Sequence, residues 1–163
     1  MLLPCTISLL LAASFAMDDQ ATATATARAE VLQQLSAVNT AELDFGTISR
    51  GSTAGQVVIA PDGSGRSVSG GVSGAGGDPH PAQFLATGSP NRTYTISHDS
   101  STTLTNGSGD TISITSLLID GPTTRQFGAD GQSQIGVGGV LSVAGNQAEG
   151  SYSGSFSLTV DYQ

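Results

Sequence analysis

The last residues of the chain, 151–163, alternate small or polar side chains with large apolar ones, and this pattern constrains the fold more than any other feature. Successive side chains of a β-strand point to opposite faces of its sheet. The pattern therefore predicts a single strand with one buried face, formed by Tyr152, Phe156, Leu158, Val160 and Tyr162. We expect such a strand either to complete a sandwich from its edge or to border a groove that another chain fills.

Short apolar runs separated by turn sequences precede this strand. They cover residues 43–48, 56–60, 66–72, 82–87, 93–98, 111–119 and 139–144. The segments between them are rich in residues that favour turns, because Gly and Asn tolerate positive φ and Pro fixes φ. Many short strands without helical periodicity predict an all-β fold, namely an antiparallel β-sandwich of the immunoglobulin-like type.

The N-terminal residues 1–16 form an apolar run that is too short to span a bilayer and ends in the small residues of Ser14-Phe15-Ala16. We predict a secretory signal peptide that is cleaved after Ala16, or alternatively near Ala23. Cleavage removes Cys5, the only cysteine. We therefore expect a mature protein without disulfides or a transmembrane anchor, in the periplasm or at the cell surface of a bacterium.

After the signal peptide we predict an extended N-terminal arm at residues 17–37 and a β-sandwich domain at residues 38–163. The arm contains a period-two repeat, in which the candidate strand-donor residues are Ala21, Ala23, Ala25, Ala27, Ala29 and Val31. The Thr residues between them favour strands, so the first interpretation is an arm that becomes a strand when it finds a partner. A helix over residues 23–35 and a flexible linker are the alternatives.

The charge of the chain argues against a nucleic-acid partner. The formal charge is −8, from 13 acidic and 5 basic residues, and the chain contains no lysine. Binding a phosphate backbone requires clustered cations, whereas the arginines of this chain are scattered singly.

The side chains suited to catalysis or metal binding form no recognisable constellation. His80 lies between two prolines, and His98 stands beside Asp99 at the end of a predicted strand. Zinc would require three or four ligands, and catalysis would require a positioned nucleophile and base. The oxygen-bearing side chains of residues 106–110 are more typical of a Gly-rich turn than of a calcium loop. We therefore predict a protein that is not an enzyme and has no catalytic, cofactor-binding or metal residues.

Several motifs together resemble a known family. In chain order they are the Ala-Thr repeat from Ala21, Leu43-Asp-Phe-Gly-Thr-Ile48, Asn91-Arg-Thr-Tyr-Thr-Ile96, Ile135-Gly-Val-Gly-Gly-Val-Leu141 and the sequence from Gly150 to Tyr162. This order resembles the bacterial domain of unknown function 4402. The resemblance implies a small exported protein without an established activity.

The C-terminus also resembles that of chaperone-usher pilins, in which a tyrosine is penultimate and a glycine stands fourteenth from the end. Tyr162 and Gly150 occupy these positions here. The resemblance implies a sandwich that lacks its last strand and receives the N-terminal arm of the next subunit. It also implies a periplasmic chaperone and further copies of the chain as partners.

The leading hypothesis is an exported structural or adhesive subunit, pilus-like or at the cell surface, that assembles by β-strand addition. Its assembly strand would comprise Gly150, Tyr152, Phe156, Leu158, Val160 and Tyr162. Because alanines bury little area, the donor arm would also need Val31, Leu32 and Leu35, and its pairing in cis or in trans stays open. The alternative is a monomeric periplasmic or surface binding module for a carbohydrate or envelope component, with a site in loops 70–81 or 120–131.

Overall fold

The computed structural model describes residues 21–163, so the predicted signal peptide and its cleavage site at Ala16 lie outside the described residues. The chain divides into two units, Met1–Glu30 and Val31–Gln163. The described residues of the first unit, 21–30, are exposed and form no helix or strand. Within residues 21–163 there is no helix long and apolar enough to cross a membrane.

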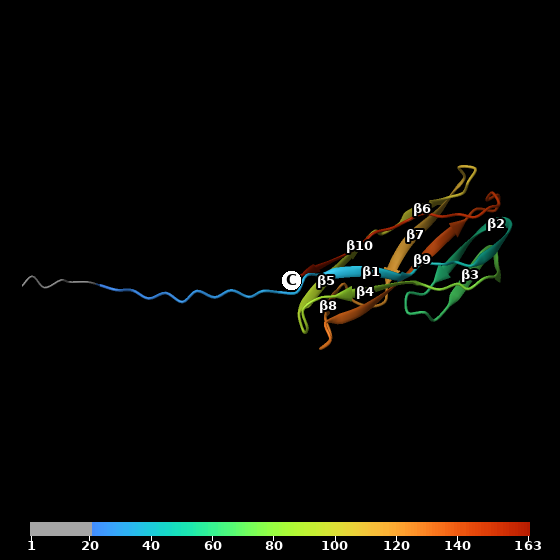
Figure 1. Ribbon diagram of the computed structural model, residues 1–163. Helices are drawn as coiled ribbons and strands as arrows, with labels where there is room; N and C mark the ends of the chain where they lie inside the picture. Colours follow the sequence, from blue (N-terminus) through green and yellow to red (C-terminus); the bar gives the residue numbers. More distant parts are fainter. Residues whose placement is uncertain (1–20) are drawn as a thin grey trace, which may run out of the picture. The chain divides into compact units, whose positions relative to one another are not determined.

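The second unit contains ten strands in its described residues (Figure 1). They are β1 (Ser36–Ala41), β2 (Thr47–Ile59), β3 (Arg66–Gly76), β4 (Ala82–Thr87), β5 (Thr93–His98), β6 (Thr102–Thr105), β7 (Thr111–Ile119), β8 (Thr124–Gln126), β9 (Gln132–Val143) and β10 (Leu158–Tyr162). All named pairings are antiparallel, which confirms the predicted all-β, antiparallel class.

The larger sheet is built around β9. Its strand order is β1-β4-β9-β2-β3, with β7 also paired to β9 and β6 paired to β7. Residues 132–137 of β9 pair with β4, and residues 139–143 pair with β2. Gly138 lies where the two partners meet, and a Cβ there would overlap the carbonyl oxygen of Ile59. Glycine therefore permits the end of β2 to approach β9 closely.

The smaller sheet has the order β10-β5-β8, and it shares one hydrophobic core with the larger sheet. Tyr94 of β5 is fully buried and stacks on Phe127, with 4.2 Å between the ring centroids. The Tyr94 hydroxyl donates to the Ser133 hydroxyl of β9, so this residue links the two sheets. Stacked aromatic pairs of this kind stabilise a core beyond the area that they bury.

Two predicted strands differ from those in the structure. The C-terminal strand is limited to residues 158–162, and the preceding residues 151–157 form an isolated β-bridge between Ser153 and Thr105 in place of a continuous strand. In the predicted strand 43–48, Asp44 forms a single bridge to His80, and β2 begins at Thr47. Each segment is therefore extended but forms a single β-bridge before the next strand begins, which is β10 for residues 151–157 and β2 for residues 43–46.

Candidate functional site

Both ends of the second unit meet at Gln33, Ser89 and Tyr162, which we call the clamp. The Tyr162 hydroxyl donates to the Gln33 carbonyl oxygen (2.7 Å) and accepts from the Ser89 N–H (2.6 Å). The Gln33 N–H donates to the Ser89 hydroxyl (2.7 Å). The clamp thus joins the chain just before β1 to the end of β10, near the C-terminus in Figure 1.

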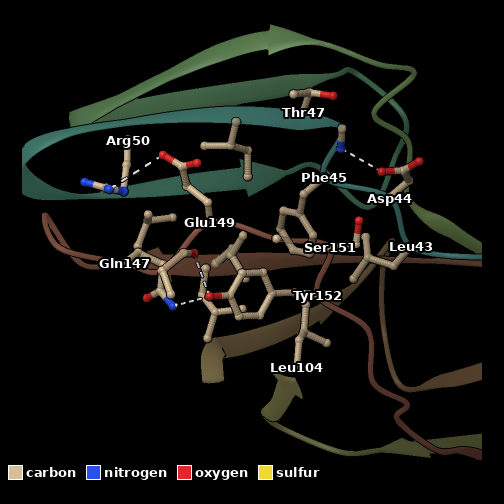
Figure 2. A pocket seen from close by; sticks show the side chains of 17 residues that line it. Leu43, Asp44, Phe45, Thr47, Arg50, Leu104, Gln147, Glu149, Ser151 and Tyr152 are labelled. Carbon is tan, nitrogen blue, oxygen red and sulfur yellow. Dashed lines mark hydrogen bonds and ion pairs between the residues drawn. The ribbon is translucent and has the colours of Figure 1, made fainter. Parts of the chain in front are cut away.

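Away from the clamp, an open slot lies between residues 42–48 and residues 147–156. The slot consists of two hollows, of about 480 and 310 Å³. Both hollows are lined by Leu43, Phe45, Leu104 and Tyr152, so they adjoin. Figure 2 shows these four side chains gathered at the larger hollow.

The floor of the slot is apolar and nearly closed. Ile112, Leu141 and Val143 lie beneath the larger hollow and are only 6%, 3% and 4% exposed. In the smaller hollow Phe84 and Phe156 pack edge to face, with 6.0 Å between their centroids. A side chain that enters the slot therefore meets an apolar surface.

The C-terminal wall of the slot is a backbone edge, whose direction is fixed by two serines. Ser153 exchanges two hydrogen bonds with Thr105 (2.9 and 3.0 Å), and the Ser157 carbonyl oxygen accepts from the Asp99 N–H (3.1 Å). In an extended chain the N–H and C=O groups of neighbouring residues point to opposite edges. The backbone groups of the even-numbered residues 152, 154 and 156, which alternate with these serines, therefore face the slot.

These slot-facing groups belong to Tyr152, Gly154 and Phe156. In the part of the chain that the structure describes, their backbone N–H and C=O groups have no hydrogen-bond partner. The large side chains of Tyr152 and Phe156 are half-buried against the core, and Gly154 keeps this segment close to Leu104. The wall thus combines an unpaired strand edge with an apolar base.

The opposite wall has the same character. Asp44 exchanges two backbone hydrogen bonds with His80 (3.0 Å each), so the flanking Leu43 and Phe45 direct backbone groups to the other edge, toward the slot that they line. Among the described residues, the Leu43 N–H and C=O and the Phe45 N–H have no hydrogen-bond partner. The Phe45 carbonyl oxygen accepts from Arg66 Nη1 at 2.9 Å.

Polar residues form the mouth of the slot, at the end away from the clamp. Arg50 and Glu149 lie on opposite sides of it, with 3.8 Å between Arg50 Nη2 and Glu149 Oε1 (Figure 2). The Glu149 side chain is 90% exposed, so this ion pair contributes little stability. The Tyr152 hydroxyl donates to the Ala148 carbonyl oxygen (2.7 Å) and accepts from Gln147 Nε2 (2.9 Å), which holds the loop at the mouth in place.

Two facing backbone edges above an apolar floor can accept an extended peptide as an added strand. Main-chain hydrogen bonds to each wall would supply affinity, and alternate side chains of the peptide would contact the floor.

Residues 35–162 match the family model described as Domain of unknown function (DUF4402). The chain belongs to the DUF4402 family. This confirms the family that the sequence resembles. No curated protein and no solved structure matches the chain. The DUF4402 domain includes every strand and both walls of the slot, whereas residues 21–31 precede it.

The structure divides the predicted assembly residues between β10 and the slot. Leu158, Val160 and Tyr162 lie in β10 and pair with His98, Ile96 and Tyr94 of β5. Tyr152 and Phe156 line the slot. Gly150 lines the larger hollow with a φ of +144°, and a Cβ there would lie 3.3 Å from the Asn106 side chain.

The predicted donor residues Ala21, Ala23, Ala25, Ala27 and Ala29 are exposed and lie in no strand. Val31 begins the second unit and is 94% exposed. Leu35 packs against the core of its own DUF4402 domain. Of the larger apolar residues that a donor strand was expected to use, Leu35 is therefore already engaged.

The sequence did not indicate the N-terminal wall or the clamp. Leu43 and Phe45 belong to an apolar run, but nothing in that run shows that it faces Tyr152. The DUF4402 resemblance includes both segments without pairing them. Predicting that Leu43 faces Tyr152 in the slot, or that Gln33 meets Tyr162 in the clamp, would require information on contacts between distant segments.

The candidate residues for other chemistry do not converge in the DUF4402 domain. His80 Nδ1 lies 3.3 Å from the Pro81 carbonyl oxygen, and His98 Nδ1 lies 2.7 Å from that of Asp99. Asn106 Oδ1 accepts from the Ser108 and Asp110 N–H groups, so the 106–110 turn bonds to itself. Residues 21–163 contain no group of three or more His, Cys, Asp or Glu side chains that could hold a metal ion.

Proposed function

We propose that this DUF4402 protein is an exported, non-enzymatic structural or adhesive subunit with an immunoglobulin-like sandwich, which assembles by β-strand addition. The slot is the acceptor, and the arm of residues 21–31 is the donor. The observation that supports this proposal is the pair of unpaired backbone edges at Leu43–Phe45 and Tyr152–Phe156, which face one apolar slot.

Main-chain hydrogen bonding is the main source of affinity in this proposal. Each hydrogen bond made on strand addition contributes about 0.5–1.5 kcal/mol net, and both walls offer donors and acceptors. The alanines of the arm add little buried area, so contacts with the apolar floor contribute less to the affinity of this donor than its main-chain hydrogen bonds do.

An open edge above an apolar floor also promotes aggregation before assembly. A periplasmic chaperone that covers the slot until the donor strand arrives is therefore an expected partner.

Deleting residues 21–29 tests the proposal. We expect the intact mature protein to form polymers, measured by size-exclusion chromatography with light scattering, and the deletion variant to be a folded monomer with unchanged circular dichroism. Polymers that persist without the arm would refute strand donation by residues 21–29. An intact protein that is monomeric at all concentrations would refute the subunit function and favour a monomeric binding module for a carbohydrate or envelope component.

A further inference from the structure

β3 is the longest edge strand, and among the described residues it pairs with β2 alone (Figure 1). Its residues 67–70 are all exposed. Proteins usually protect such an edge with charged side chains, a proline or a covering loop. Residues 67–76 include neither a charged residue nor a proline. This edge is therefore open to pairing with another strand.

The other edge strands are protected in the ways that are common for such strands. β8 has only three residues and β6 only four, and Thr105 of β6 already pairs with Ser153. β10 carries Asp161, and β1 has a register shift between Asn39 and Ala41. The unprotected edge of β3 is the exception.

The one charged residue of β3 is engaged inside the domain. The Arg66 guanidinium donates to the carbonyl oxygens of Phe45, Thr47 and Gly76, so it is not free to extend along the edge. Two copies that each carry a formal charge of −8 can therefore meet at β3 without bringing acidic side chains of that strand together.

The hairpin register shows which backbone groups face the free edge. At its closed end the Ala60 N–H donates to the Gly65 carbonyl oxygen (3.1 Å), and the next pairs include Val58 with Ser67 and Val57 with Val68. Hydrogen-bonded and non-hydrogen-bonded pairs alternate along an antiparallel ladder. Val57 and Val68 are therefore a non-hydrogen-bonded pair, and the Val68 N–H and C=O point away from β2.

The side chain of Val68 also lacks a neighbour on that side. Its cross-strand partner Val57 is fully buried, whereas Val68 is 43% exposed. Directly opposed residues share one face of a sheet, so Val68 extends the core face to the margin of the sheet. A strand added beside β3 would cover this valine.

Residues 66–70 are complementary to themselves. An antiparallel copy centred on Val68 brings the two Val68 residues together, and they would exchange two N–H···O hydrogen bonds. Ser67 then lies opposite Ser69 of the second copy, and Arg66 lies opposite Gly70, which has no side chain to oppose it. Such a contact has two-fold symmetry and uses the same surface of both copies.

The contact between two single domains is weak. Residues 66–70 present about 17 Å of edge, and Gly70, with a φ of +73°, ends this straight part of β3. An interface of this length is much smaller than that of a stable complex. Many such contacts between two polymers add up, because each one raises the effective concentration of the next. Single domains therefore stay monomeric in dilute solution, whereas polymers associate side by side.

We propose that the free edge of β3 is a lateral contact site, at which β3 of one copy pairs antiparallel with β3 of another, centred on Val68. The association of polymers rests on the proposed function, whereas the edge pairing itself uses neither the slot nor the arm.

Single cysteines test the pairing in a full-length Cys5→Ser chain. Opposed residues of a hydrogen-bonded pair have Cα atoms about 5.5 Å apart, which a disulfide can span. During diamide oxidation at high protein concentration, we expect Val68→Cys to form disulfide-linked dimers about tenfold faster than Leu118→Cys, as measured on denaturing gels without reductant. Leu118 is the matched control, since it is also 43% exposed but lies in β7, which is paired on both sides.

Ser67→Cys tests the register. Its sulfur and that of the second copy would occupy diagonal positions, which a disulfide cannot span without backbone movement. We therefore expect Ser67→Cys to react no faster than Leu118→Cys. Fast dimer formation by Ser67→Cys in place of Val68→Cys would overturn the register centred on Val68, and equal rates for all three variants would overturn the edge pairing.

Val68→Lys tests the consequence for polymers. It would place two ammonium groups opposite each other at the contact, which opposes strand pairing. In electron micrographs we expect bundled filaments from the parent protein and from Leu118→Lys, and single filaments from Val68→Lys. Bundles of Val68→Lys would overturn the lateral role. A parent protein that forms no polymers would refute the proposed function, and the disulfide rates would still decide the edge pairing.

Discussion

Arg66 shows how a single side chain fixes one wall of the slot. Its Nη1 donates to the carbonyl oxygens of Phe45 (2.9 Å), Thr47 (3.1 Å) and Gly76 (3.3 Å). These bonds span Gly46, which has a φ of +70° and turns the chain into β2. The orientation of Phe45 at the slot therefore depends on Arg66. In the sequence, Arg66 could not be distinguished from the other scattered arginines.

Replacing Arg66 with Met should destabilise the domain. Hydrogen bonds from a charged group contribute about 1.5–3 kcal/mol, so we expect the Arg66→Met variant to lose about 2–3 kcal/mol in the free energy of unfolding, measured by urea denaturation. Arg50→Met is the matched control, since it removes the same charge from an exposed pair and should cost less than about 1 kcal/mol. Equal losses in the two variants would mean that Arg66 does not hold the wall.

At the scale of elements, the arm has two faces with different expected roles. If it enters the slot as a strand, one face contacts the floor, and the alanines suit that apolar floor better than the threonines between them, which carry hydroxyl groups. We expect the triple variant Ala23→Asp, Ala25→Asp and Ala27→Asp to abolish assembly, because it would bring carboxylates onto an apolar floor.

The threonine face supplies the control. Thr22→Asp, Thr24→Asp and Thr26→Asp add the same charge to the same segment but should leave assembly within about threefold of the parent, as measured by the polymer fraction in light scattering. Loss of assembly in both triple variants would show that charge on the arm matters, whichever face carries it. Loss only in the threonine variant would reverse the assignment of the faces.

The elements also show how far the sequence could predict this fold. Alternation indicated which side chains of residues 152–162 meet the core, but it could not limit the strand to residues 158–162, because strand length depends on partners. β5 supplies a partner for Leu158–Tyr162, whereas residues 151–157 meet β6 at one bridge only. β8 (Thr124–Gln126) and β6 were missed because they are short and contain few apolar residues.

At the scale of the whole molecule, the C-terminal half of the site could be predicted from sequence and the N-terminal half could not. Tyr152 and Phe156 carry a local period of two, which is visible along the chain. Their position opposite Leu43 and Phe45 follows from the order in which β1, β4, β9 and β7 pair, and no local pattern encodes that order. The clamp at Gln33 and Tyr162 likewise joins residues from opposite ends of the domain.

An assembly with one slot and one arm per copy is heterologous, so each joint uses two different surfaces, and the copies form an open chain unless the rotation between them closes a ring. A variant without the arm and a variant with a blocked slot should therefore form a single joint with each other. The deletion of residues 21–29 keeps the slot, and Leu43→Trp keeps the arm but places a bulky indole ring where the two hollows adjoin, in the path of an inserted strand. We expect each variant alone to be monomeric, and an equimolar mixture to give a one-to-one heterodimer and nothing larger, as measured by light scattering. Ser155→Trp in the smaller hollow replaces Leu43→Trp if that variant does not fold. Polymers in the mixture would require a second interface, and an absence of heterodimers from two folded variants would mean that the arm and the slot do not bind each other.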